Sequence, residues 1–194
     1  MPIETFQLVW PAAEHLPGYI QALQQGWSPD TLRAQAAQEH LELIAEDPNV
    51  FLSQQIDREA RGPGVVLPDG STVPRLSGLV RWMWDGEYCG TIGLRWQAGT
   101  DELPPYCLGH IGYSVVPWKR RRGYATRALG MFLPEVRNEG LRQVEIVTGV
   151  ANVASQRVIE ANGGKFVEQF LSEIYADRER IRYRISLAQP ASDN

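Results

Sequence analysis

The chain has little cysteine and no long apolar run, and each absence excludes a class of protein. Cys89 and Cys107 are its only cysteines, so a disulfide framework is not indicated and reduced thiols are expected. No apolar stretch approaches the ~20 residues of a membrane span. The N-terminus lacks a basic region followed by an apolar one, which argues against a secretory signal. We therefore expect a cytoplasmic protein with no membrane partner.

Positive charge is also in deficit. The formal net charge is −4 over 194 residues, which argues against a nucleic-acid binder as judged from the whole chain. Hydrophobic residues make up 43% of the sequence and there is no internal repeat, a composition that suits one globular domain with a sizeable core. We expect residues 1–194 to form that single domain, without nucleic acid and without a metal ion.

The most informative stretch is Val115–Thr126, which reads Val-Val-Pro-Trp-Lys-Arg-Arg-Arg-Gly-Tyr-Ala-Thr. An apolar strand pattern leads into it from Ile111, and a helix pattern leaves it toward Leu133. A strand that turns into a helix at a glycine leaves several backbone N–H groups unpaired, and the helix dipole adds partial positive charge at the same end. This arrangement predicts a site for a phosphate or pyrophosphate.

The spacing within this stretch narrows the choice of ligand. Arg120-x-x-Gly123-x-Ala125 fits the pattern Gln/Arg-x-x-Gly-x-Gly/Ala, whereas neither a Walker A loop nor a dinucleotide-binding Gly-x-Gly-x-x-Gly is present. The basic run Lys119–Arg122 has a second interpretation as a nuclear signal or a solvated patch. Its place between a strand and a helix favours a local anion site.

The order of predicted elements indicates an α/β fold with a mixed central sheet of about seven strands flanked by helices. Asp85-Gly86 is typical of a two-residue type I′ hairpin turn, and Ser28-Pro29-Asp30 of a helix start. Pro134 is expected to kink or shorten its helix. We expect strands at Thr5–Val9, Leu79–Trp84, Glu87–Leu94, His110–Val116, Val144–Thr148, Lys165–Phe170 and Ile181–Leu187, and helices at Glu14–Gln25, from Ser28 to just before Asp47-Pro48, Ala125–Asn138 and Ala154–Ala161.

The loop and this order together resemble the GNAT superfamily of N-acyltransferases. The resemblance implies that residues 79–187 form an acetyl-CoA-binding core and that residues 1–60 form a helical acceptor side. In that family the strand before the loop, here 110–116, splays from its neighbour and pairs with pantetheine. The cofactor residues implied are Val115, Val116, the side chains of Arg120, Arg121 and Arg122, and the backbone from Arg121 through Gly123, Tyr124 and Ala125 to Thr126.

A second segment is similar to the Asn-x-x-Ser helix of ribosomal-protein alanine acetyltransferases. It runs from Asn152 through Ser155 to Gly163, and the resemblance places Asn152 at the pantetheine arm and Ser155 near the cofactor. Asn152 is also a good helix N-cap, and one side chain can do both. Segments like Trp84–Glu87 and Gly109–Tyr113 occur in a group of bacterial predicted acetyltransferases, which the chain also resembles.

One position departs from the family. Many GNAT enzymes carry a tyrosine seven residues after the asparagine as general acid for the leaving thiolate, and here that position is Ile159. Ser155, Tyr124 or a water molecule are the alternatives. A thiolate whose conjugate thiol has a pKa of about 8.5 needs only modest help.

The proton of the acceptor amine needs a base only if the amine is strongly basic. Deprotonating a lysine-like amine at pH 7 costs about 4.6 kcal/mol, whereas an α-amine costs about 1 kcal/mol. His110 aligns with the acidic residue that many GNAT enzymes carry before Ile-Gly-Tyr, and its ordinary pKa suits proton acceptance. A histidine that only hydrogen-bonds across the sheet is the competing interpretation, and Glu145 is the second candidate base.

The sequence therefore predicts an N-acetyltransferase that moves an acetyl group from acetyl-CoA to a primary amine of a small molecule, an amino acid or a peptide N-terminus by direct attack. The catalytic candidates are His110, Glu145 and Ser155. The alternative is a non-catalytic acyl-CoA-binding sensor of the same fold. Either protein would be a monomer or a homodimer.

Overall fold

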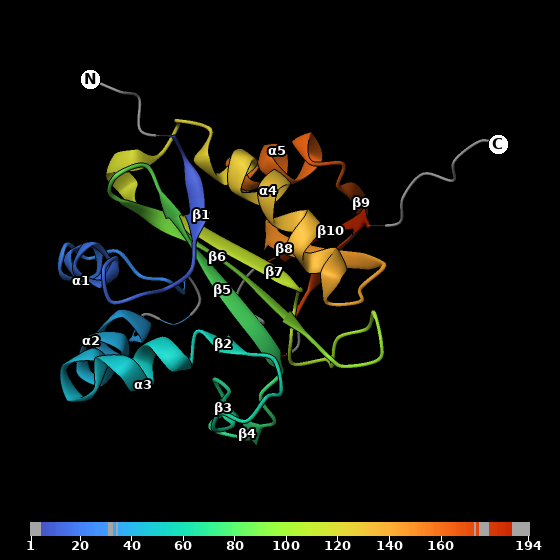
Figure 1. Ribbon diagram of the computed structural model, residues 1–194. Helices are drawn as coiled ribbons and strands as arrows, with labels where there is room; N and C mark the ends of the chain where they lie inside the picture. Colours follow the sequence, from blue (N-terminus) through green and yellow to red (C-terminus); the bar gives the residue numbers. More distant parts are fainter. Residues whose placement is uncertain (1–4, 31–32, 34, 173, 175–178, 188–194) are drawn as a thin grey trace.

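Two sheets form the framework of the computed structural model, which describes residues 5–30, 33, 35–172, 174 and 179–187 (Figure 1). In the described part of the chain, the first sheet has the order β1-β5-β6-β7, with the short β2 added to β5, and the second has the order β8-β10-β9. All strand pairings among the described residues are antiparallel. The strands are β1 (Gln7–Val9), β2 (Ile56–Asp57), β5 (Ser77–Trp84), β6 (Tyr88–Trp96), β7 (Ile111–Val115), β8 (Gln143–Gly149), β9 (Lys165–Leu171) and β10 (Glu179–Ser186), with a separate small hairpin of β3 (Val65–Val66) and β4 (Thr72–Val73).

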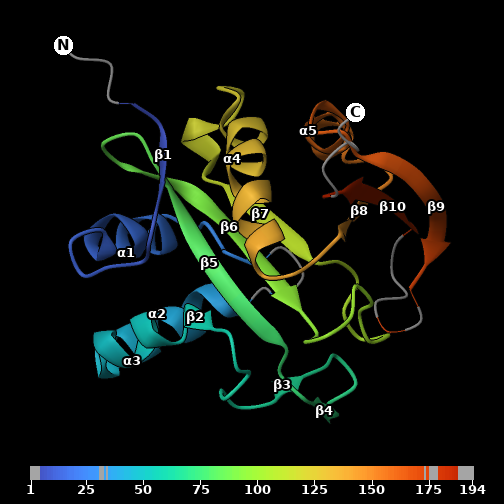
Figure 2. The same ribbon diagram turned by 45° about the vertical axis from the view of Figure 1, so that its right-hand side comes forward.

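Helices cover both faces of the first sheet. Helices α1 (Leu16–Gln24), α2 (Ala36–Glu46) and α3 (Pro48–Ser53) lie on one side of it, while α4 (Tyr124–Asn138) lies on the other, as Figure 2 shows. Helix α5 (Val153–Ala161) packs near the second sheet. The predicted α/β fold is confirmed. The central sheet is divided into two, with β7 at the edge of the first sheet and β8 at the edge of the second.

Two apolar cores hold these layers together. The larger core lies between α4, α5 and the two sheets and includes Phe132, Ile146 and Ile159, all at most 2% exposed. The second core joins α1–α3 to the opposite face of the first sheet around Tyr19 and Trp82, whose rings stack at 4.7 Å. Each fully buried side chain of this size contributes roughly 1.5–3 kcal/mol. The cores fix both sides of β7, the strand nearest the second sheet.

Two predicted boundaries are wrong, and local hydrogen bonds explain both. The second helix begins at Ala36 rather than at Ser28, whose hydroxyl donates to the Asp30 carbonyl in a turn of its own; residues 31, 32 and 34 lie outside the described residues. The β5–β6 hairpin has three tip residues instead of two, because the Asp85 N–H donates to the Glu87 carbonyl and the register shifts there.

Two prolines have different outcomes. Pro134 lies inside α4, which continues to its predicted end at Asn138, so of the two effects expected of this proline the early end does not occur. Asp47-Pro48 ends α2 as predicted, yet it also starts α3: the Asp47 carboxylate accepts hydrogen bonds from Asn49 N–H and Val50 N–H, and proline occupies the first turn.

Candidate active site

The loop between β7 and α4 presents six backbone N–H groups. After β7 the chain makes a 3₁₀ turn, η1 (Pro117–Lys119), and then reaches the first turn of the 15-residue α4. The N–H groups from Arg121 to Thr126 donate no hydrogen bond to any described residue, whereas Arg127 N–H already donates to the Gly123 carbonyl. Unpaired donors at the positive end of a helix dipole are suited to an anion.

Left-handed backbone shapes this loop. Gly123, the N-cap of α4, has φ +76°, and Arg121 has φ +63°. Alternation of left-handed and right-handed residues turns successive N–H groups toward one point, which is the geometry of an anion-binding nest. A Cβ added at Gly123 would meet no heavy atom within 4 Å. The glycine is therefore required by its φ rather than by contact with neighbouring side chains.

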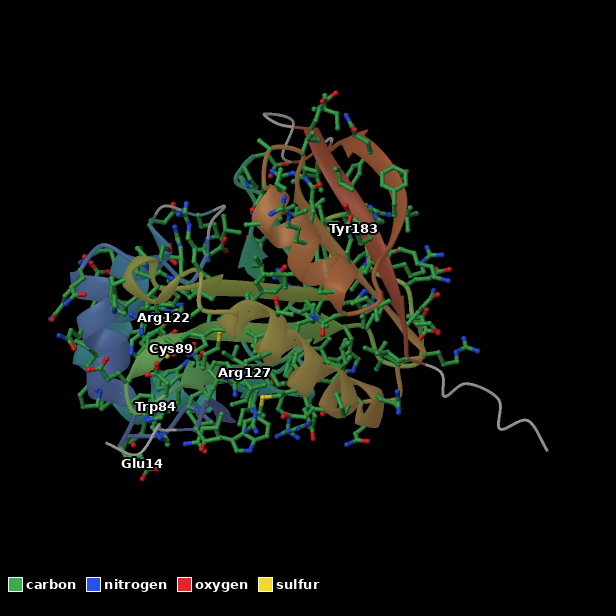
Figure 3. All side chains as sticks on the ribbon, turned by 90° about the horizontal axis from the view of Figure 1, so that it is seen from above. Glu14, Trp84, Cys89, Arg122, Arg127 and Tyr183 are labelled. Atoms are coloured by element: carbon green, nitrogen blue, oxygen red, sulfur yellow. The ribbon has the colours of Figure 1, made fainter. Side chains whose placement is uncertain are left out.

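The basic run of the loop divides into two parts. Arg120, Arg121 and Arg122 are exposed and form no ion pair with the described residues; Figure 3 shows Arg122 beside the start of α4. The Arg120 Nε–H donates to the Val115 carbonyl over 3.1 Å. Lys119 is instead 8% exposed, so only the three arginines are available to an anion in solvent.

Lys119 belongs to a buried network that ties the loop to the tip of the β5–β6 hairpin. Its Nζ lies 2.9 Å from Asp85 Oδ1 and 2.8 Å from Glu87 Oε2. The Tyr124 hydroxyl donates to the same Asp85 carboxylate over 2.5 Å. Asp85 therefore holds Lys119 and Tyr124, which lie on either side of residues 120–123, and the Tyr124 hydroxyl is already bonded within the fold.

The pKa of Asp85 reflects this network. Burial alone would raise it, but hydrogen bonds from Tyr124, Lys119 and Cys89 together with the Lys119 charge lower it to about 2. The carboxylate is therefore ionised at any physiological pH. Burial lowers the pKa of Lys119, but the hydrogen bonds to Glu87 and Asp85 raise it by more, so that it lies above its ordinary value.

The edge of β7 that faces the second sheet has unpaired backbone groups. Arg95 N–H donates to the His110 carbonyl, and Val116 N–H donates to the Cys89 carbonyl, so these groups point toward β6. Because backbone groups alternate along a strand, those of Tyr113 and Val115 point the other way, toward β8. Val116 also accepts from Lys119 N–H and therefore offers no free group to a ligand. The unpaired edge of β7 is therefore formed by Tyr113 and Val115, and Val116, which the sequence predicted as a cofactor residue, is not part of it.

His110 closes one end of the gap between β7 and β8. The backbone N–H of His110 donates to the Glu145 carbonyl over 2.7 Å, and the ring Nδ1 of His110 accepts from the backbone N–H of Glu145 over 3.0 Å. Beyond this point no backbone hydrogen bond joins Ile111–Val115 to β8. The two strands therefore part after His110, which is the splay predicted for 110–116.

This geometry gives the two candidate bases other partners. The Nδ1 lone pair of His110 is used by Glu145 N–H, the side chain is 1% exposed, and burial lowers its pKa despite nearby carboxylates. The Glu145 carboxylate forms ion pairs with Arg184 at 2.7 Å and Arg182 at 3.5 Å. Each side chain therefore holds strands together: His110 joins β7 to β8, and Glu145 joins β8 to β10.

The start of α5 supplies the remaining predicted residues. Asn152 is the N-cap, and its Oδ1 accepts from Ser155 N–H over 3.1 Å. The predicted capping role is confirmed. The Ser155 hydroxyl lies 2.7 Å from the Tyr113 hydroxyl, which connects α5 to β7. Ile159, where many relatives have a tyrosine, is fully buried in the core.

A family model decides the classification. The model described as Acetyltransferase (GNAT) domain matches residues 8–165, most of the chain. The chain belongs to the GNAT acetyltransferase family. The family predicted from the loop is thereby confirmed, and the protein is an enzyme of the acetyltransferase class.

Solved GNAT structures share the fold at low sequence identity. The microcin C7 self-immunity acetyltransferase MccE, solved with acetyl-CoA and AMP, has a TM-score of 0.59 at 12% identity and covers 96% of this chain and 97% of its own. A ribosomal L7/L12 alpha-N-protein acetyltransferase solved with coenzyme A has a TM-score of 0.58 at 16% identity and covers 95% of this chain and 96% of its own. The Salmonella typhimurium enzyme that modifies the N-terminal serine of L7/L12 has a TM-score of 0.60 at 16% identity and covers 94% of this chain and 95% of its own. No curated protein sequence matches the chain.

Other features of this GNAT enzyme limit its chemistry. Burial raises the pKa of the Cys89 thiol to about 12 and also raises the pKa of Cys107, so neither thiol is activated as a nucleophile. Among the described residues, no cluster of three or more His, Cys, Asp or Glu side chains could hold a metal ion. No helix in that same part of the chain is long and apolar enough to cross a membrane.

Sequence reasoning missed two residues at this site. From the sequence Asp85 is predicted only as a turn residue, because nothing in its spacing relates it to Lys119. Tyr113 belongs to a segment that resembles other bacterial acetyltransferases, which does not by itself indicate a role for its side chain. Period-two alternation along β7 was the available signal, since it places Tyr113 and Val115 on the same edge of the strand.

Proposed function

We propose that this GNAT enzyme is an acetyl-CoA-dependent N-acetyltransferase that acts on a primary amine. The observation that carries the proposal is the row of six unpaired N–H groups from Arg121 to Thr126, which adjoins the unpaired edge of β7 at Val115 and Tyr113. The row suits a pyrophosphate and the edge suits an amide-bearing chain, in the order in which coenzyme A carries them. Two structural neighbours were solved with acetyl-CoA or CoA.

In this proposal each element has one task. The loop N–H groups hold the pyrophosphate, and the exposed Arg120, Arg121 and Arg122 add positive charge around it. The Val115 backbone pairs with the pantetheine arm. The Arg120 guanidinium, which donates to the Val115 carbonyl in the structure, moves away from it when the arm binds. The Asn152 side-chain nitrogen, which has no hydrogen-bond partner among the described residues, faces the same arm.

The reaction is a direct transfer. The amine lone pair forms the new C–N bond, the C–S bond breaks with its electron pair moving to sulfur, and one proton passes in net from nitrogen to sulfur. An unpaired backbone N–H of β7 at Tyr113 or Val115 donates to the thioester oxygen as negative charge develops there. No covalent enzyme intermediate is needed, in agreement with the raised pKa of both thiols.

The acceptor we propose is an amine of low pKa, such as the α-amine of an amino acid or a peptide N-terminus. This choice follows from His110 and Glu145, whose basic atoms are already bonded within the fold. Without a strong base, an α-amine costs about 1 kcal/mol to deprotonate at pH 7, compared with about 4.6 kcal/mol for a lysine side chain. At pH 7 the unprotonated, reactive fraction of an α-amine is therefore several hundred times larger than that of a lysine side chain.

Residues 1–60 form the acceptor side of the proposed single domain. The Trp27 Nε1–H donates to the Ser114 hydroxyl over 2.9 Å, and that hydroxyl donates to the Ser28 carbonyl over 3.5 Å. Ser114 lies on β7 between Tyr113 and Val115. The segment after α1 is therefore fixed directly opposite the proposed reaction centre, on the sheet face that α4 does not cover.

The test is release of CoA thiol from acetyl-CoA in the presence of an amine panel, measured as kcat/KM against pH. We expect α-amines to be preferred, with kcat/KM rising through the pKa of each amine, about 7.8 for an α-amine and about 10.4 for a lysine side chain. A rise at one fixed pH for every acceptor would instead indicate a base on the enzyme, with His110 the first to examine. Binding of acetyl-CoA without thiol release for any amine would support the alternative of a non-catalytic acyl-CoA-binding sensor. The buried Ile159 at the position of the usual tyrosine favours that alternative.

A further inference from the structure

The hydroxyl groups of Tyr113 and Ser155 form a pair across the open end of the β7–β8 gap. Their oxygens lie 2.7 Å apart, and the Tyr113 hydroxyl is also 3.3 Å from the Ser155 carbonyl. Tyr113 comes from the same strand segment whose backbone groups face the gap, and Ser155 lies in the first turn of α5. Two elements far apart in the chain thus meet at a single polar contact beside the proposed path of pantetheine.

The other hydroxyl candidates near the loop are occupied. The Tyr124 hydroxyl donates to Asp85 over 2.5 Å, and the usual tyrosine position on α5 is Ile159, buried in the core. Either hydroxyl can be the donor of this contact; when Tyr113 is the donor, the Ser155 hydroxyl accepts one hydrogen bond and donates its own proton to no described acceptor. The Ser155 proton is then available to a ligand in the gap.

We propose that Tyr113 is a positioning residue that orients and polarises the Ser155 hydroxyl, which in turn donates a hydrogen bond to the sulfur of CoA as the thiolate departs. This inference rests on the proposed function. It supplies, from β7, the tyrosine hydroxyl that many relatives carry at the position of Ile159. A chain of two hydroxyl donors strengthens the terminal hydrogen bond, because each bond polarises the next.

Charge and protonation agree with this role. Burial raises the pKa of Tyr113 to about 12, although the hydrogen bond with Ser155 opposes the shift. Tyr113 therefore remains protonated beside a thiolate whose conjugate thiol has a pKa of about 8.5, and it acts as a hydrogen-bond donor that keeps its proton. The amino end of α5 adds partial positive charge near the same point. The proton that sulfur finally accepts replaces the one lost by the amine, through water.

The test measures the thiol pKa of bound CoA from the ultraviolet absorbance of its thiolate, which needs no acceptor amine. We expect the wild-type complex to have a thiol pKa below that of free CoA. Tyr113→Phe and Ser155→Ala should each raise it by roughly one unit. If the hydroxyls act as one unit, the double variant should raise it no further than the larger single change. The kcat should fall roughly tenfold or more in each variant, by the same factor for every acceptor.

Tyr183→Phe is the matched control. The Tyr183 hydroxyl also joins a strand to α5, through Glu160 at 3.1 Å, but Figure 3 shows it in the second sheet, away from Arg122. It should leave the thiol pKa and kcat unchanged. An unchanged thiol pKa in folded Tyr113→Phe with CoA bound would overturn the inference. Failure of the wild type to bind CoA in calorimetry would instead overturn the proposed function.

Discussion

Gly123→Val should weaken CoA binding at least roughly hundredfold, since two lost charge-assisted hydrogen bonds correspond to about 3 kcal/mol or more. Gly123 has φ +76°, a conformation in which a β-branched residue is strained by about 1–3 kcal/mol. The first turn of α4 can relax to a negative φ, and the row of N–H groups then no longer converges. Calorimetric titration with CoA measures the loss, and circular dichroism checks that the helices persist.

Gly140→Val provides the matched control for strain. Gly140 has φ +89°, a Cβ there would meet no atom within 4 Å, and it follows the opposite end of α4. The variant should lose a similar amount of stability and bind CoA as the wild type does. Unchanged CoA affinity in a folded Gly123→Val protein would remove the loop from the proposed site.

Asp85→Ala should destabilise the protein by about 3 kcal/mol, because it leaves the buried Lys119 ammonium with only one carboxylate partner. For a chain of this size the melting temperature should fall by roughly 6–12 °C. The Asp85 side chain is 11% exposed and Lys119 10%, whereas Glu87 is 77% exposed. Glu87→Gln is therefore the control, with a loss of less than about 1 kcal/mol. Equal losses would show that the buried pair is not the stabilising contact.

The effect of Asp85 should also depend on pH in one direction. Its pKa is about 2 in the folded protein and lies below its ordinary value of 3.8, so the ionised carboxylate favours folding. This contribution is complete above the unfolded pKa and is lost as the pH falls through the folded value. The difference in melting temperature between wild type and Asp85→Ala should stay constant above about pH 5 and shrink below about pH 4.

The sequence predicted the parts of the site that depend on local order along the chain. A strand, a glycine and a helix start in succession placed the N–H row at Arg121–Thr126, and the N-cap preference of asparagine placed the start of α5. Both depend on neighbours within a few residues, so they could be predicted without the fold.

Long-range partners could not be predicted in this way. The Asp85 carboxylate meets Lys119 and Tyr124 only because the β5–β6 hairpin folds back against the loop. Nothing near His110 in the sequence predicts that Glu145 N–H donates to its Nδ1. Arg182 and Arg184 reach Glu145 only because β10 pairs with β8. Each of these contacts depends on how strands from distant parts of the chain pair.

Hydrogen exchange with and without acetyl-CoA tests the central claim most directly, because the proposed ligand contacts are mainly backbone N–H groups that are unpaired in the fold. Acetyl-CoA should slow exchange at the amides of Tyr113 and Val115 and along Arg121–Thr126, and it should leave the exposed edge strand β9 (Lys165–Leu171) unchanged. Binding detected by calorimetry with no new protection at these amides, or with protection only elsewhere, would contradict a cofactor site in the gap between β7 and β8.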